Sequence, residues 1–86
     1  MAKIPNWSRE QKYEDKTMPF YWEHDKRNQQ VIVDRDRQRG GYTVLFFDIG
    51  ERPEKMDYPS VIIAETARKE DARGNAIMWM ENHPNP

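Results

Sequence analysis

The chain has 86 residues, of which 36% are hydrophobic and 34% charged, and its formal net charge is −1. A chain of this length buries about 60–65% of the surface that its unfolded form exposes, which excludes two separate hydrophobic cores. The absence of cysteine excludes disulfides, a thiolate nucleophile and a Cys-based zinc site, and it favours a reducing compartment. No apolar run follows Met1, and no stretch approaches the roughly 20 apolar residues that span a bilayer, so we expect a cytoplasmic protein and no membrane partner.

Residues 1–19 are polar and predict an N-terminal arm that precedes a single domain over residues 20–86. Within the arm, Ser8-Arg9-Glu10-Gln11 fits a capping box and predicts a short helix behind Trp7. Such a helix would offer Trp7 only Tyr13 as an apolar partner. The arm is therefore either a loose tail or a segment that Trp7 anchors over the domain.

Three runs in the middle of the chain have the aromatic and β-branched composition of strands, and they cover residues 20–24, 30–34 and 42–48. Turn-forming residues separate them, including the pair Gly40-Gly41. The three runs therefore predict an antiparallel β-meander. A charged loop over residues 49–57 follows, and Val61–Ala64 predicts a fourth strand at the sheet edge next to Pro59.

The C-terminal segment has helical periodicity from Thr66, the expected N-cap, to Pro84, which ends the helix. One helix face collects the apolar and aromatic positions Ala72, Ala76, Trp79, Met80 and His83. The sequence thus predicts an α+β fold, with a three- to four-stranded antiparallel β-meander and one C-terminal α-helix packed on one face.

One helix can cover only one face of such a sheet. In the strand over residues 42–48, Val44 and Phe46 point to one face and Leu45 and Phe47 to the other, so both faces are apolar. We expect the second face to be covered by the N-terminal arm, by a second copy of the chain or by a ligand. The candidate residues of this interaction face are Trp22, Tyr42 and Phe47.

Basic residues are concentrated between residues 26 and 39, where the chain has five of them and two acidic residues, Asp34 and Asp36. The five are Lys26, Arg27, Arg35, Arg37 and Arg39. Arginines on a hairpin can fork onto phosphates or guanine edges while sheet aromatics stack on bases, and this pattern indicates DNA binding. The alternating aspartates also fit a solvated, self-paired strand edge.

Few residues occur in patterns typical of catalytic or metal-binding sites. His24 and His83 are the only histidines, and the expected roles are a partly exposed strand residue and a helix-end residue, so no metal is predicted. The acidic residues Glu51, Glu54 and Asp57 lie in a predicted loop with no desolvating pocket, and neither Ser8 nor Ser60 has a nucleophile signature. We expect no catalytic residue, no cofactor and no small-molecule substrate.

The start Asn6-Trp7-Ser8-Arg9 and the end Trp79-Met80-Glu81-Asn82-His83-Pro84, with the aromatic hairpin between them, resemble a group of short archaeal proteins from halophiles whose function is unknown. The resemblance implies a compact, strand-rich domain with a terminal helix. It implies no functional residue, and this chain lacks the strong acidity of that group.

The function that these patterns favour is a small, non-enzymatic binding module. DNA is the most concrete partner, through the basic hairpin and the open sheet face. The alternative is a protein–protein interaction or homodimerisation module that uses the exposed apolar face.

Overall fold

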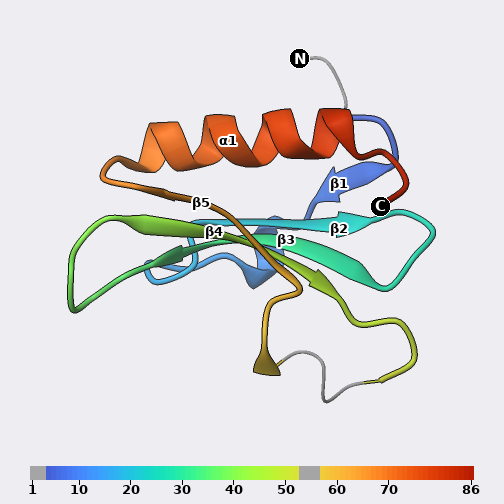
Figure 1. Cartoon of the computed structure of the whole chain (residues 1–86), viewed down its shortest axis with the longest axis horizontal. Helices are drawn as coiled ribbons and strands as arrows, with labels where there is room; N and C mark the ends of the chain where they lie inside the picture. Colours follow the sequence, from blue (N-terminus) through green and yellow to red (C-terminus); the bar gives the residue numbers. More distant parts are fainter. Residues whose placement is uncertain (1–3, 53–56) are drawn as a thin grey trace.

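The computed structural model describes residues 4–52 and 57–86, so part of the loop predicted over residues 49–57, including Glu54, lies outside the described residues. The described chain forms one five-stranded antiparallel sheet in the order β1-β2-β3-β4-β5, with a helix over one face (Figure 1). The elements in chain order are β1 (Trp7–Arg9), the 3-10 helix η1 (Gln11–Tyr13), β2 (Phe20–His24), β3 (Gln29–Arg35), β4 (Tyr42–Asp48), β5 (Val61–Thr66) and α1 (Lys69–Asn82). The predicted α+β meander with a C-terminal helix is confirmed, but it has five strands instead of three or four.

The additional strand is β1, which pairs Trp7 with His24 and Arg9 with Trp22. The prediction of a helix starting at Ser8 is wrong, because Ser8 lies in this strand and its hydroxyl donates to the Asp25 carboxylate. Trp7 is only 1% exposed, and its burial favours the strand over a short helix with a single apolar partner. The segment predicted as an arm therefore supplies one edge of the sheet.

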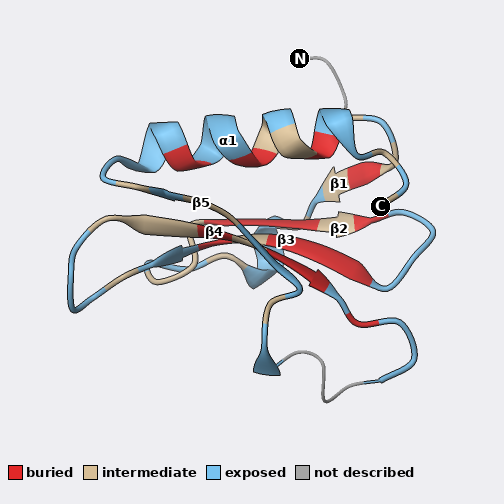
Figure 2. Cartoon of the chain, in the orientation of Figure 1, coloured by how far each residue is buried: buried red, intermediate tan, exposed pale blue. Residues whose placement is uncertain are grey.

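The predicted apolar face of α1 is confirmed for Ala72, Ala76 and Met80, which are fully buried against the sheet (Figure 2), whereas His83 is exposed at the helix end. The ring of Trp79 lies 4.7 Å from that of Phe46 on β4. These contacts close the core between α1 and the sheet.

The start of α1 differs from the prediction. Thr66 is not an N-cap, because β5 continues to this residue, where Thr66 pairs with Tyr42. The Thr66 hydroxyl donates to the carbonyl oxygen of Arg68, and the helix begins at Lys69. Strand pairing therefore holds Thr66, which the helical periodicity had placed at the start of the helix, in β5.

The C-terminal tail is tied to the first hairpin of the sheet. The Trp7 indole N–H donates to the carbonyl of His83 at 3.1 Å, and His24 Nε2 lies 2.7 Å from the carbonyl oxygen of Pro84. Nδ1 of His24 accepts the backbone N–H groups of Lys26 and Arg27, so the ring donates through Nε2. The expectation of a partly exposed His24 is wrong, because the ring is buried in this contact.

Truncating Met80 tests the helix-to-sheet core. We expect Met80→Ala to lower the free energy of unfolding by about 3 kcal/mol, because it leaves a cavity among fully buried side chains. Met78→Ala is the matched control on the outer face of the same helix, and it should change stability by less than about 0.5 kcal/mol. Urea unfolding measures both, and equal losses would contradict the packing described.

Candidate interaction surfaces

The sheet face that points away from α1 carries an apolar row across four strands. Tyr21 of β2 lies opposite Ile32 of β3, Ile32 opposite Leu45 of β4, and Leu45 opposite Ile62 of β5. Tyr21 is buried, Ile32 and Leu45 are half-buried, and Ile62 is 60% exposed. Trp7 does not cover this row, because it packs in the core cluster under α1. We call this surface the open face.

A β-bulge decides that Ile62 belongs to the open face. The register with β4 shifts between Val44, which pairs with Ala64, and Leu45, which pairs with Ile62. Ile63 and Ala64 both pack against the core, whereas Ile62 points away from it. Sequence alternation predicts the strand but not the bulge, so Ile62 was missed as a surface residue.

A groove of about 410 Å³ lies on the open face, between the segment after β1 and the strands β2 and β3. We call it the tyrosine groove, and its lining residues are Tyr13, Met18, Tyr21, Glu23, Gln30 and Ile32. The rings of Tyr13 and Tyr21 lie 5.0 Å apart. The carboxylate of Glu14 supports this wall, because it accepts the backbone N–H of Tyr21 and forms an ion pair with Arg9 at 2.8 Å.

Polar groups line one end of the tyrosine groove. The Tyr21 hydroxyl donates to one carboxylate oxygen of Glu23 at 2.9 Å. Burial, and then this carboxylate, raise the pKa of the Tyr21 phenol. Gln30, which is paired with Glu23 across β2 and β3, adds a side-chain amide to this end of the groove.

The structure separates the three residues predicted for an interaction face. Trp22 is buried in the core, where its ring stacks on Phe20 at 5.7 Å. Tyr42 packs against the same core cluster. Phe47 alone shares a strand face with Leu45, and it is itself buried. The apolar row, and not these three aromatics, is the surface that remains accessible.

The predicted basic residues are also separated. Lys26 and Arg27 lie in the turn between β2 and β3, whereas Arg35, Arg37 and Arg39 lie at the other end of β3, around the turn to β4. Because a strand joins the two turns, the basic residues form two groups at opposite ends of the sheet. Arg27 is engaged with the C-terminal tail, where it donates to the backbone oxygen of Pro86 at 2.7 Å.

The turn between β3 and β4 is built by side-chain and glycine geometry. The carboxylate of Asp36 accepts the backbone N–H groups of Gln38 and Arg39, both at 3.0 Å, and these bonds hold its pKa below the usual range. Gly41 has a φ of +81°, and a Cβ there would lie 2.6 Å from the carbonyl oxygen of Thr66. The turn is therefore held in one conformation.

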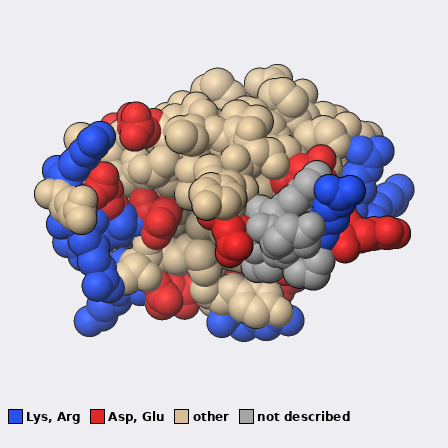
Figure 3. Space-filling view, turned by 60° about the horizontal axis from the view of Figure 1, so that its bottom comes forward, with Lys and Arg blue, Asp and Glu red and all other residues tan. Residues whose placement is uncertain are grey.

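The arginines of this turn form no ion pair among the described residues, although the positive charge of Arg37 acts on the carboxylates of Asp15 and Asp34. The ion pairs within residues 4–52 and 57–86 join Arg9 with Glu14 and Lys12 with Glu10. Neither pair includes Arg35, Arg37 or Arg39, which we call the hairpin arginines. Figure 3 shows a large group of Lys and Arg side chains at the left, the side on which the β3–β4 turn lies in Figure 1.

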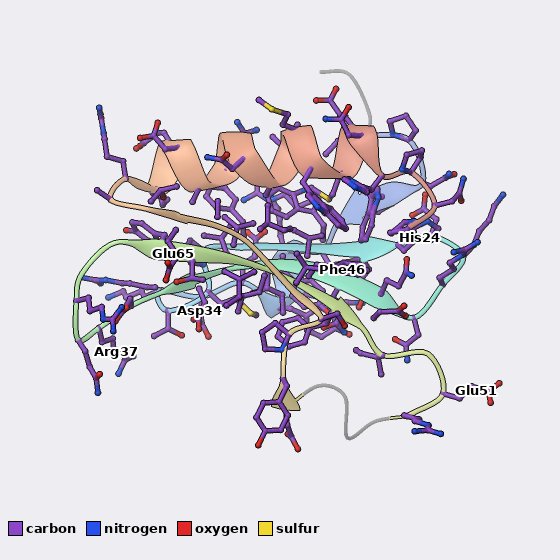
Figure 4. All side chains as sticks on the ribbon, viewed as in Figure 1. His24, Asp34, Arg37, Phe46, Glu51 and Glu65 are labelled. Atoms are coloured by element: carbon purple, nitrogen blue, oxygen red, sulfur yellow. The ribbon has the colours of Figure 1, made fainter. Side chains whose placement is uncertain are left out.

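The charged strand residues of the open face are acidic. Glu23, Asp34 and Glu65 lie on this side of the sheet. Glu23 is paired with Gln30, and Asp34 and Glu65 are each paired with Thr43 from the strands on its two sides. Paired residues share a face, and side chains along one strand alternate between the two faces. Figure 4 places Asp34 below the sheet, and burial raises the pKa of its carboxyl. The apolar row is thus flanked by carboxylates, and Figure 4 places Arg37 on the same side of the sheet.

The residues weighed for catalysis have structural partners or are exposed. Ser60 Oγ accepts the backbone N–H of Asp48 at 3.1 Å, and His83 stacks on Trp79 with Nδ1 2.7 Å from the Trp79 carbonyl. Glu51 and Asp57 are exposed. Within the part of the chain that is described, no three His, Cys, Asp or Glu side chains are grouped closely enough to hold a metal ion.

No family model, no curated protein and no solved structure matches the chain. In the described ranges, no helix has both the length and the apolar character needed to cross a bilayer, and α1 itself has 14 residues. The arguments about function below therefore use the surfaces of this chain alone.

Acid titration tests the carboxylates that hold the surface segments. The hydrogen bond from Arg9, more than any other contact, lowers the pKa of Glu14 from its ordinary value of 4.5, and hydrogen bonds from Thr17 and Met18 lower that of Asp15 from 3.8. A carboxylate whose pKa falls on folding stabilises the fold above its unfolded pKa, and this stabilisation is lost as the pH falls through the folded pKa.

We expect the free energy of unfolding to decline below about pH 4.5, and Glu14→Gln to flatten that decline. At pH 7 the same substitution should cost about 0.5–1 kcal/mol, the size of a partly exposed ion pair. Exposed Glu51→Gln is the control and should leave the pH profile unchanged. Urea unfolding from pH 2 to 7 measures all three proteins, and a Glu14→Gln profile as steep as that of the wild type contradicts the assignment.

Proposed function

We propose that this protein is a non-enzymatic protein-interaction module that docks onto another protein surface through its open face. The observation that carries the proposal is the apolar row, whose four side chains are in register on four adjacent strands and whose last member, Ile62, is 60% exposed. Contiguous apolar surface rimmed by polar residues is typical of interaction sites.

The packing of the other face supports this proposal. Val31, Val33 and Val44 are fully buried under α1, and the core cluster there does not include the side chains of the apolar row. An antiparallel sheet with one face on the core usually carries polar residues on its other face, whereas this one carries Ile32, Leu45 and Ile62 there. Burying a fully exposed Ile or Leu side chain gains about 1.5–3 kcal/mol. A partner would gain part of this at Ile62, which is 60% exposed, and less at Ile32 and Leu45, which are already half-buried.

The charged rim supports a protein partner over nucleic acid. An apolar centre with a polar rim is the usual anatomy of a protein interface. The rim here includes Glu23 and Glu65, whose charge attracts a basic protein surface and repels phosphate. The open face therefore favours a partner that brings both apolar and basic side chains.

Site-specific photocross-linking tests the proposed function with a closely matched control. A benzoylphenylalanine at position 62 or at position 78 replaces a side chain that is 60% or 61% exposed, Ile62 on the open face and Met78 on the outer side of α1. We expect irradiation in the native cells to give one recurrent product at position 62 and none at position 78. Leu45→Lys in the same chain should remove the product.

Equal and diffuse cross-linking at both positions contradicts the proposal. A product at position 62 that survives Leu45→Lys also contradicts it, because Leu45 is the direct neighbour of Ile62 in the apolar row. The mass of the product reports whether the partner is another protein or a second copy of the chain.

DNA binding is a second candidate, supported by one observation at the end of the sheet. The hairpin arginines lack ion-pair partners among the described residues, and the aspartate between them, Asp36, is engaged with backbone N–H groups. The candidate site is then restricted to the β3–β4 turn. Lys26 and Arg27 are left out, because they lie at the other end of β3.

Anisotropy titrations of labelled duplex DNA at several salt concentrations test this candidate. If the three arginines each neutralise a phosphate, the logarithm of the affinity should fall with the logarithm of salt with a slope of about −2.7, roughly −0.9 per contact. Arg37→Ala should reduce the slope by about one contact and Lys26→Ala should not. Unchanged anisotropy at low salt excludes the candidate.

A further inference from the structure

We propose that the tyrosine groove receives an arginine side chain, and that the arginine comes from the β3–β4 turn of a second copy of this chain. This inference rests on the proposed function, because the groove is part of the open face. It identifies both the chemistry that the face recognises and the partner that supplies it.

The walls of the groove suit the stem and the plane of an arginine. Tyr13, Tyr21 and Ile32 give it aromatic and aliphatic sides, against which the three methylene groups of arginine can pack. A guanidinium group also stacks favourably on tyrosine rings. The volume of about 410 Å³ leaves room for one such side chain and the backbone that carries it.

The polar end of the groove suits the guanidinium head. One oxygen of Glu23 accepts the Tyr21 hydroxyl, and its carboxylate has further lone pairs for a charge-assisted bond. Arginine presents five N–H donors in a planar fork, which matches a carboxylate better than the point charge of lysine does. The groove thus offers the acceptor that an arginine needs at the end of an apolar channel.

Gln30 adds a second acceptor at the polar end of the groove. It lines the groove beside Glu23, its partner residue in the β2–β3 pairing. An arginine that reaches Glu23 would bring N–H donors to this end of the groove, where the amide oxygen of Gln30 can accept one.

The chain itself carries the complementary element. The hairpin arginines lie on or beside a turn whose backbone is held by Asp36 and Gly41, so the backbone that presents an arginine loses little entropy on binding. Figure 4 places Arg37 on the side of the sheet that faces away from α1. The acidic groove and the basic turn are thus two complementary surfaces of one molecule.

A two-fold arrangement satisfies both surfaces at once. In an isologous dimer each copy gives one turn and one groove, so two arginine contacts form and no complementary surface is left over. With the open faces opposed, the apolar rows meet between the two contacts, as the inner faces of a β-sandwich do at a separation of about 10 Å. Self-association therefore covers the exposed face of the sheet.

A charge exchange tests the inference by sedimentation equilibrium of the full chain from about 1 μM to 1 mM. We expect the wild type to dimerise, and Glu23→Arg and Arg37→Glu each to weaken dimerisation at least tenfold. Carrying both substitutions in one chain should restore at least half of the lost affinity, in logarithmic terms, because each groove again meets an opposite charge. Glu51→Arg and Arg52→Glu are controls of equal charge change outside the groove and the turn, and should have little effect.

A second readout covers the case in which Glu23→Arg does not fold, which circular dichroism would reveal. Glu23→Gln keeps the shape and an acceptor for Tyr21 but removes the charge, and it should also weaken dimerisation. In the wild type, the NMR signals of Tyr13 and Tyr21 should shift with protein concentration, and in Glu23→Gln they should shift only at higher concentration.

The outcomes separate this inference from the proposed function. If the wild type stays monomeric to 1 mM, the partner is not a second copy and the inference is overturned. Cross-linking at position 62 to a different protein would in that case leave the proposed function standing. If a dimer forms but the charge exchange does not change its affinity, the claim that an arginine occupies the groove is overturned. If Arg37→Glu abolishes DNA binding but not dimerisation, the turn serves nucleic acid and the inference is also overturned.

Discussion

One α-helix covers one face of a five-stranded sheet, and the rest of the structure follows from which side chains it covers. Fourteen residues of α1 place Ala72, Ala76 and Met80 over the strands and complete a core that includes Trp7 and Phe46. A helix of this size has no second apolar face to offer, and the chain is too short for another layer. The opposite side of the sheet therefore keeps an apolar surface that the fold itself does not use.

The two ends of the chain reinforce this asymmetry. Trp7 belongs to β1, but its ring lies under α1, where its indole N–H holds the His83 carbonyl. His24 and Arg27 bind the residues after the helix. All of these contacts add to the covered side or its edge, while among the described residues the segment after β1 brings Tyr13 against Tyr21 on the open face. That segment forms one wall of the tyrosine groove and does not close over it.

Sequence reasoning predicted what repeats along the chain and missed what depends on distant pairing. Alternation in β4 predicted two apolar faces, and the helical spacing predicted the buried side of α1. A three-residue strand has no readable period, so β1 was missed, and the bulge that exposes Ile62 has no local signal. Lys26 and Arg35 are close in sequence, but the seven residues of β3 place roughly 20 Å between its ends at about 3.3 Å per residue. The tyrosine groove needs Tyr13 and Gln30 side by side, which only the folded chain provides.

The central claim is that the face away from α1 is apolar, accessible in the isolated chain and covered on association. Methyl NMR with a soluble paramagnetic probe measures this directly, because the probe broadens only the methyl signals that it can approach. In dilute protein, the account predicts strong broadening for Ile62 and Leu45 and almost none for Val31 and Val44, with protection of the first pair rising as the protein is concentrated. Equal protection of all four residues at every concentration would contradict it.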